Sequence, residues 1–123
     1  MDGREGGMED EGAMVYPDDL DEAGWPQTPA EDPRFLICDG QVKRQALSWL
    51  WEPFGRVHDL AFEELDIEDV APSHLPLLRQ AIASLLLQEG MPDLAPDLAA
   101  YLTRLEVFVA DLERQGKGLT VSL

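Results

Sequence analysis

The sequence predicts a mainly α-helical protein, a small helical bundle of about four helices that ends in a helical hairpin. Two observations carry this prediction. Apolar residues recur at three- and four-residue steps through the last third of the chain, and prolines, glycines and short acidic residues bound the periodic segments. A third observation, the composition of residues 1–33, predicts a disordered acidic tail and leaves residues 34–123 as a single helical domain.

Residues 1–33 carry eleven acidic residues and one basic residue, with few aliphatic side chains and no helical period. Such a segment buries too little apolar surface to offset the entropy lost on ordering. Tyr16, Leu20 and Trp25 nevertheless alternate with acidic residues, which is typical of disordered segments that dock into an apolar groove with a basic rim. We interpret these three residues as partner-binding. The alternatives are a solvated leader or local packing on the chain's own domain.

Two short apolar runs are candidates for β-strands. Residues 34–38 lie between a proline and an Asp-Gly pair, and residues 119–123 follow a glycine-rich breaker. If both runs are extended, we expect them to pair as a two-stranded ribbon that packs on the helices. The alternative is that the first run leads directly into a helix.

Residues 41–51 show a helical period after Asp39, which suits an N-cap, and before a proline, which is expected to stop the helix. The two tryptophans of this segment fall on different faces, so at least one should lie near the surface. Because aromatic side chains dominate binding hot spots, we predict partner-binding roles for Trp49, Trp51 and Phe54.

A second short helix is predicted from residue 56 to about residue 65, with four apolar residues on its inner face: Val57, Leu60, Ala61 and Leu65. Acidic residues occupy its end and the following loop. We predict that these acids form a partner-binding patch made of Glu63, Glu64, Asp66, Glu68 and Asp69.

The helical hairpin is predicted over residues 73–116. Ser73 is the candidate cap of its first helix, Gly90 ends that helix, and Gly116 lies just after the last turn of the second helix. The apolar stripe of the first helix includes Leu75, Leu78, Ile82, Leu85 and Leu86. The stripe of the second helix is wider and places on one face Leu98, Tyr101, Leu102, Leu105, Phe108, Val109 and Leu112.

The formal net charge is −16, and eleven of the 25 acidic residues lie within residues 1–33. So negative a chain argues against direct binding of nucleic acid or of anionic membranes, because both need clustered basic residues. It favours a partner protein with a basic surface. The alternative is that the charge only solvates the protein.

His58 and the neighbouring carboxylates are the candidate metal or acid–base cluster. Di-iron carboxylate bundles use Glu-x-x-His pairs, and this sequence contains none. A thiol–imidazole pair would need Cys38 close to His58 or His74, and nothing in the spacing indicates this. We therefore expect no metal, no cofactor and no enzymatic activity. One cysteine forms no internal disulfide, and no apolar run reaches the ~20 residues of a membrane span, so we expect a cytoplasmic protein.

These observations predict a small acidic protein–protein interaction module, an adaptor or accessory subunit that binds through a helical face and an acidic–aromatic tail. The alternative is an inhibitor of the immunity or antitoxin type, or a DNA mimic, whose acids occupy the basic groove of a nucleic-acid-binding protein. Steep salt dependence of binding would separate the inhibitor from the adaptor. A homodimer that buries the wide stripe of residues 98–112 is a further expectation.

Overall fold

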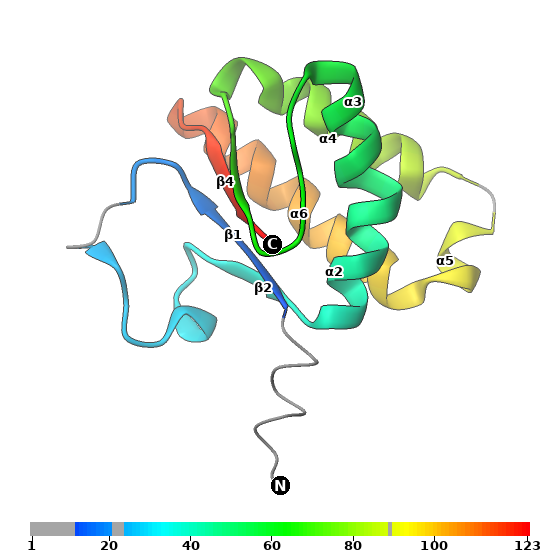
Figure 1. Cartoon of the computed structure of the whole chain (residues 1–123), viewed down its shortest axis with the longest axis horizontal. Coiled ribbons are helices and arrows are strands. Elements are labelled where there is room, and N and C mark those ends of the chain that lie inside the picture. Colours follow the sequence, from blue (N-terminus) through cyan, green and yellow to red (C-terminus); the bar gives the residue numbers. More distant parts are fainter. Residues whose placement is uncertain (1–11, 21–23, 89) are drawn as a thin grey trace, which may run out of the picture.

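The computed structural model describes residues 12–20, 24–88 and 90–123, and over these residues the protein is mixed α/β (Figure 1). In the described part of the chain, four strands form an antiparallel sheet in the order β2-β1-β4-β3. Their bounds are β1 (Ala13–Pro17), β2 (Leu36–Cys38), β3 (Ile67–Val70) and β4 (Leu119–Ser122). The prediction of a helical bundle is therefore wrong, because the helices pack against a sheet and not only against one another.

Along the chain, the helical segments lie between the strands, after β1 and before β4. The α-helices are α2 (Gly40–Ala46), α3 (Glu52–His58), α4 (Leu75–Leu86), α5 (Met91–Leu94) and α6 (Pro96–Gln115). A π-helical turn, η3 (Leu47–Trp51), joins α2 to α3, and two short 3-10 turns are η2 (Pro29–Glu31) and η4 (Pro72–His74).

Strand β1 corrects the prediction that residues 1–33 form a disordered tail, because residues 13–17 of that segment are a central strand. β1 pairs with β2 on one side and with β4 on the other. The two runs predicted to pair with each other are both strands, but β1 lies between them. Residues 1–11 lie outside the described residues, so the prediction for that part of the tail stays a prediction.

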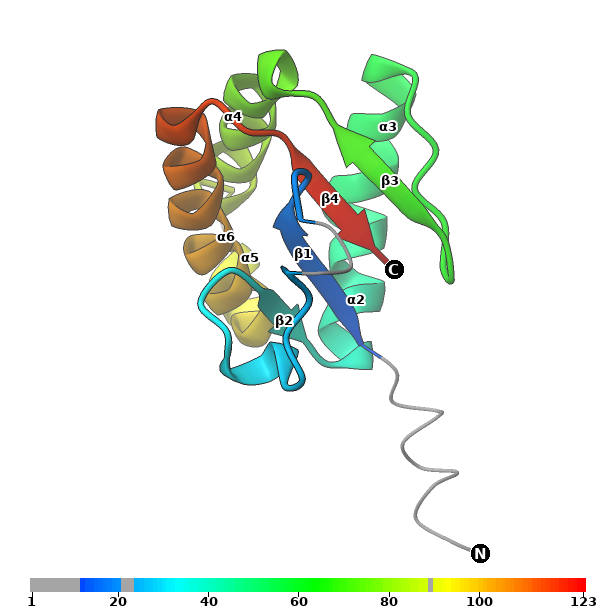
Figure 2. The same cartoon turned by 90° about the vertical axis from the view of Figure 1, so that its left-hand side faces the viewer.

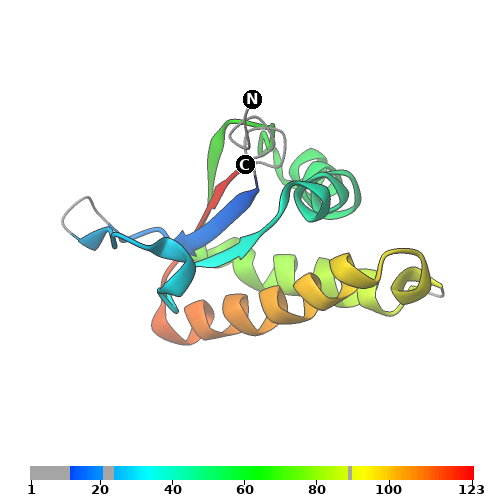
Figure 3. The ribbon, with the colours of Figure 1, turned by 90° about the horizontal axis from the view of Figure 1, so that it is seen from below.

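The longer helices lie on one face of the sheet (Figure 3). Helices α4 and α6 pack together, and the continuous run α2–η3–α3 packs beside them. The opposite face, which Figure 2 turns toward the viewer, has no α-helix among the described residues, and residues 24–35 pass in front of part of it. We call this face the outer face.

The core lies between the inner face of the sheet and the helices. The sheet contributes inward-pointing residues from its strands, including Val15, Val70, Leu119 and Val121. Helix α6 contributes its predicted stripe, which is buried at Leu98, Tyr101, Leu102, Leu105, Val109 and Leu112 and half-buried at Phe108. This burial confirms the prediction that these residues form one apolar stripe along the helix. Because the chain's own sheet and helix α4 cover the stripe, it is not a surface for a second copy.

The predictions for residues 41–65 need two corrections. The helix does not stop at Pro53. In a regular α-helix the proline ring would clash with the preceding turn, but here that turn is π-helical and has a different geometry. The run instead ends at His58, where Asp59 adopts a left-handed conformation with φ of 60°. No helix covers 59–65, and Val57, predicted to point inward, is exposed.

The predicted helix ends are partly right. Asp39 caps α2, since its carboxylate accepts a hydrogen bond of 2.9 Å from the backbone N–H of Val42. Gly116 ends α6 with φ of 72°, a left-handed conformation that glycine adopts at little cost. Ser73 is not a cap: it lies in η4, and α4 begins at Leu75 without a side-chain cap.

Candidate protein-interaction surface

The outer face of the sheet is organised by strand register into two rows of side chains. In one row, Asp69 of β3, Thr120 of β4 and Tyr16 of β1 lie side by side. In the other, Ile67, Ser122, Met14 and Ile37 follow one another across all four strands. Successive residues of a strand point to opposite faces, so both rows point away from the core. One row is covered by the chain itself, and the other is not.

The covered row carries an aromatic cluster made of Tyr16, Trp25 and Phe35. The ring centroids of each pair lie 5.1–5.2 Å apart, and Trp25 meets both partners edge to face. Such pairs add about 0.5–1.5 kcal/mol each beyond the area they bury. Burial, and then the negative charge of Asp69, raise the pKa of the Tyr16 phenol. The cluster therefore corresponds to the predicted alternative in which these aromatic residues pack on their own domain.

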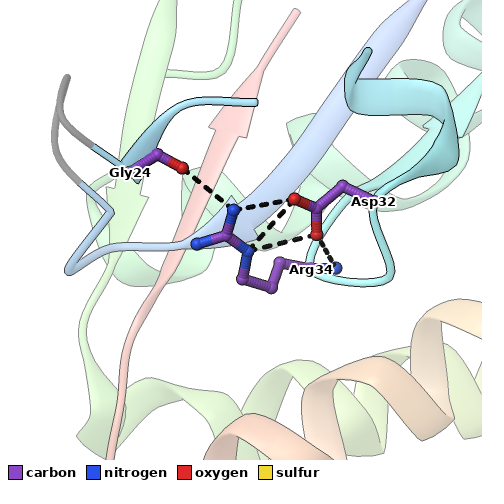
Figure 4. Close-up of polar contacts among 3 residues, drawn as sticks. All are labelled: Gly24, Asp32 and Arg34. Carbon is purple, nitrogen blue, oxygen red and sulfur yellow. Dashed lines mark hydrogen bonds and ion pairs between the residues drawn. The ribbon is translucent and has the colours of Figure 1, made fainter. Parts of the chain in front are cut away.

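Arg34 holds the segment that carries Trp25 in place (Figure 4). Its guanidinium donates a hydrogen bond of 2.9 Å to the carbonyl of Gly24 and one of 2.7 Å to the carboxylate of Asp32. The backbone N–H of Arg34 donates a further bond of 2.8 Å to that carboxylate. These hydrogen bonds lower the pKa of Asp32. Arg34 thus links the two ends of residues 24–34.

The uncovered row lines a shallow groove of about 910 Å³, which we call the sheet groove. Its walls include the row residues Met14, Ile37 and Ile67 together with Leu65, and Pro29 and Ala30 close one side. Ile67 is 65% exposed and Leu65 is 75% exposed. Exposed aliphatic side chains that adjoin one another on a sheet face are typical of an interaction site.

Leu65 has an unusual backbone conformation for its residue type. Its φ is 68°, in the left-handed region that non-glycine residues occupy rarely and at a cost of about 1–3 kcal/mol. The conformation turns the chain from the loop after α3 into β3 and leaves the leucine side chain at the sheet groove. Leu65 therefore lies outside the core, and its side chain is part of the lining of the sheet groove.

Three of the five predicted acids have side chains that bind other described residues of the chain, and the other two, Glu63 and Asp66, have exposed side chains. Glu64 forms an ion pair of 3.4 Å with the buried ammonium of Lys43, which also donates to the carbonyl oxygen of Leu123. Glu68 accepts a hydrogen bond of 2.9 Å from the backbone N–H of Ala61. Asp69 accepts one of 2.7 Å from the hydroxyl of Thr120. These three acids stabilise the loop and strand in which they lie.

Glu63 and Asp66 are exposed and flank Leu65 on either side of the turn. Their backbones close that turn, with the Asp66 N–H donating to the Glu63 carbonyl over 3.2 Å. Asp39 is the one acidic residue among the described residues of the groove wall, and its carboxylate also caps α2. None of the described residues that line the sheet groove is basic. The lining of the sheet groove is therefore mainly apolar with one acidic residue, and Glu63 and Asp66 lie outside the lining, in the turn that carries Leu65; we call these three acids the rim.

The aromatic residues predicted to be anchors are divided between core and surface. Trp51 is 1% exposed and Phe54 is 4% exposed, so both belong to the core. Trp49 is half-buried in a separate groove between α3 and α4. Leu20 is half-buried in a hollow near α6. The structure therefore does not bring the predicted anchors together on one surface.

The outer-face residues Met14, Ile37 and Ile67 were missed as site residues. A signal for β1 is present in the sequence: residues 13–16 form an uninterrupted apolar run between Gly12 and Pro17, which is typical of a strand covered on both faces. No comparable signal marks Ile67, because its exposure depends on the outer face carrying no α-helix among the residues that the structure describes.

The candidate chemical residues are not assembled into a reactive site. Burial raises the pKa of the Cys38 thiol, which also shares a hydrogen bond with Tyr101. Cys38 precedes α2 and His58 ends α3, so they lie at opposite ends of one helical run. The ring of His58 instead lies 5.3 Å from that of His74. Among the described residues, no three His, Cys, Asp or Glu side chains are grouped to hold a metal ion.

Comparison with known proteins found no matching family model, no similar curated protein and no similar solved structure. Within the described part of the chain, no helix combines the length and the apolar character that crossing a bilayer requires.

Proposed function

We propose that this protein is a small acidic interaction module, an adaptor or accessory subunit that binds a basic partner protein through the outer face of its sheet. The observation that carries the proposal is the sheet groove, where the exposed side chains of Leu65 and Ile67 are part of a mainly apolar lining and the acidic residues Glu63 and Asp66 lie beside Leu65 in the same turn. The role is one of binding and not of catalysis, and we assign it to the cytoplasm, in keeping with a single, unpaired cysteine.

The affinity of such a site would come mainly from its aliphatic residues. Full burial of a leucine or isoleucine side chain contributes about 1.5–3 kcal/mol, and two such residues adjoin here. The acids would contribute mostly to the association rate and to the choice of partner. A segment that fits has apolar side chains for the floor and Lys or Arg side chains that reach the exposed acids Glu63 and Asp66 beside Leu65.

The charge of the rim also argues against a second copy on this face. Two copies that met through their sheet grooves would bring their acidic turns together without any basic residue among the lining residues to offset them. A basic heterologous partner removes this repulsion. It is therefore the occupant that the charge favours.

The inhibitor that mimics nucleic acid remains the alternative, and the hydrogen bonding favours the adaptor over it. A phosphate mimic needs a series of free carboxylates, whereas Glu64, Glu68 and Asp69 are each engaged within the chain. The response to salt separates the two, since a charge mimic should lose most of its affinity in concentrated salt.

The test is affinity capture from the native cell extract with the full-length protein and three variants. Ile67→Asp places a charge on the apolar floor. Glu63→Gln with Asp66→Asn removes rim charge and keeps size. Val107→Asp is the matched control, since Val107 is also an exposed aliphatic residue but lies on α6, away from the sheet groove. The captured partner is identified, purified and measured at about 0.1 M and about 1 M salt.

We expect Ile67→Asp to weaken binding of the purified partner by about 10- to 100-fold, as burial of about 1.5–3 kcal/mol implies. The rim variant should slow association, and the control should bind as the wild type does. A partner that binds Ile67→Asp and the control equally well would overturn the proposal. Complete loss of binding at about 1 M salt would favour the inhibitor.

A further inference from the structure

A second apolar groove lies between the run η3–α3 and helix α4, and we call it the helix groove. Its volume is about 400 Å³, and its walls include Trp49, Pro53, Val57, Leu77, Ala81 and Leu85. It shares no lining residue with the sheet groove. The two grooves are therefore separate surfaces.

The helix groove differs from the rest of the protein in its charge. Charged residues make up 28% of the chain, yet none of the described residues that line this groove is Asp, Glu, Lys or Arg. Two copies of a protein with a net charge of −16 repel each other least where neither surface carries charge. A basic partner, in contrast, gains nothing from a neutral surface. The charge therefore favours a second copy of this chain as the occupant.

The shape of the helix groove also suits contact between two identical surfaces. Val57 is 76% exposed beside the groove, and Leu77 is exposed on the facing helix. Around a twofold axis, the protruding residue of one copy can enter the hollow of the other while the reverse contact forms at the same time. Trp49, half-buried in the groove wall, supplies the large aromatic surface that such contacts use.

The backbone conformation at Trp49 is a second, independent indication that the helix groove is a functional surface. Trp49 lies in the π-helical turn η3, and single π-helical turns within helices occur frequently at functional sites. The turn lies between α2 and α3 and carries both Trp49, at the groove, and Trp51, in the core.

We propose that the helix groove is the interface of a homodimer, in which Val57 of each copy packs into the groove of the other beside Trp49. This inference does not rest on the proposed function, because it uses different residues and a different occupant. It also predicts the opposite response to salt. Salt screens the repulsion between two negative copies and strengthens the dimer, whereas it weakens the binding of a basic partner.

The test is sedimentation velocity of the full-length protein over a micromolar concentration series at about 0.1 M and about 1 M salt. We expect a monomer–dimer equilibrium that shifts toward the dimer at the higher salt concentration. Val57→Glu should raise the dissociation constant of the dimer by at least about tenfold, because it buries a carboxylate in an apolar contact. Leu77→Glu, on the opposite wall, should act in the same direction.

Val107→Glu is the matched control, since it adds the same charge at an exposed aliphatic position on α6, outside the helix groove. It should weaken the dimer less than Val57→Glu does. A protein that stays monomeric at every concentration and both salt concentrations would overturn the proposal and leave the groove to another occupant. So would a dimer that salt disperses, or one that Val57→Glu and the control weaken equally.

Discussion

Strand β1 should contribute directly to the free energy of unfolding, and Val15 is the position that tests this most sharply. Val15 is buried on the inner face between its register partners, Leu36 of β2 and Val121 of β4. Val15→Ala removes the equivalent of two methylene groups, which costs about 1.6 kcal/mol at about 0.8 kcal/mol each. The cavity left between the strands adds to this cost, so we expect a total loss of about 2–3 kcal/mol.

The loss is measured by urea unfolding followed through tryptophan fluorescence. With a slope of about 1–3 kcal/mol per molar, the midpoint should fall by roughly 1 M or more. Met14→Ala is the matched control, since Met14 neighbours Val15 on the same strand but lies on the outer face. Met14→Ala should lower the free energy of unfolding clearly less than Val15→Ala does. Equal and small shifts for both variants would mean that β1 does not pack in the core, and the disordered tail would then be the better description.

Two further predictions concern alkaline stability and the aromatic cluster. Burial raises the pKa of Tyr101 and of Tyr16. Each phenol therefore stabilises the folded state below the ordinary tyrosine pKa of about 10, and this stabilisation is lost as the pH rises through the folded-state pKa. The free energy of unfolding should fall steeply as the pH rises above about 10, and it should fall less steeply in Tyr101→Phe. Equal pH dependence of the free energy of unfolding in the wild type and in Tyr101→Phe would contradict this. Arg34→Ala should free residues 24–34 and shift Trp25 emission toward the red, whereas an unchanged spectrum would show that the aromatic contacts suffice.

The longer helices α4 and α6 were largely predictable, because each has an apolar period that depends on local sequence alone, whereas the helix predicted over residues 56–65 was wrong. The stripe of α6 and its glycine end are examples, and the cap at Asp39 is another. Strand β1 was not predicted, because its five residues lie within an acidic, glycine-rich segment whose average composition predicts disorder. A short strand needs only a few apolar residues when its neighbours supply the hydrogen bonds, and those neighbours lie far away in the sequence.

The candidate surface was harder to predict than the fold, for a physical reason. Whether an apolar residue belongs to a core or to a surface depends on which elements cover it. Leu65 and Ile67 looked like ordinary aliphatic residues and are exposed, whereas Trp51 and Phe54 were predicted to be anchors and are buried. The acids raise the same difficulty, since the pairing of Glu64 with Lys43 joins residues that are distant in the sequence.

The two proposed surfaces should behave independently, and a double variant tests this directly. They share no lining residue, and effects at separate sites without common partners usually add within about 0.5 kcal/mol. Ile67→Asp should weaken partner binding by about 10- to 100-fold and leave the dimer intact, whereas Val57→Glu should weaken the dimer by at least about tenfold and leave partner binding intact. The double variant should therefore stay folded and show both losses at their single-variant size, checked by circular dichroism, sedimentation and binding of the purified partner. If Val57→Glu also abolished capture, the partner would recognise the dimer, and the two surfaces would be coupled through avidity and not independent.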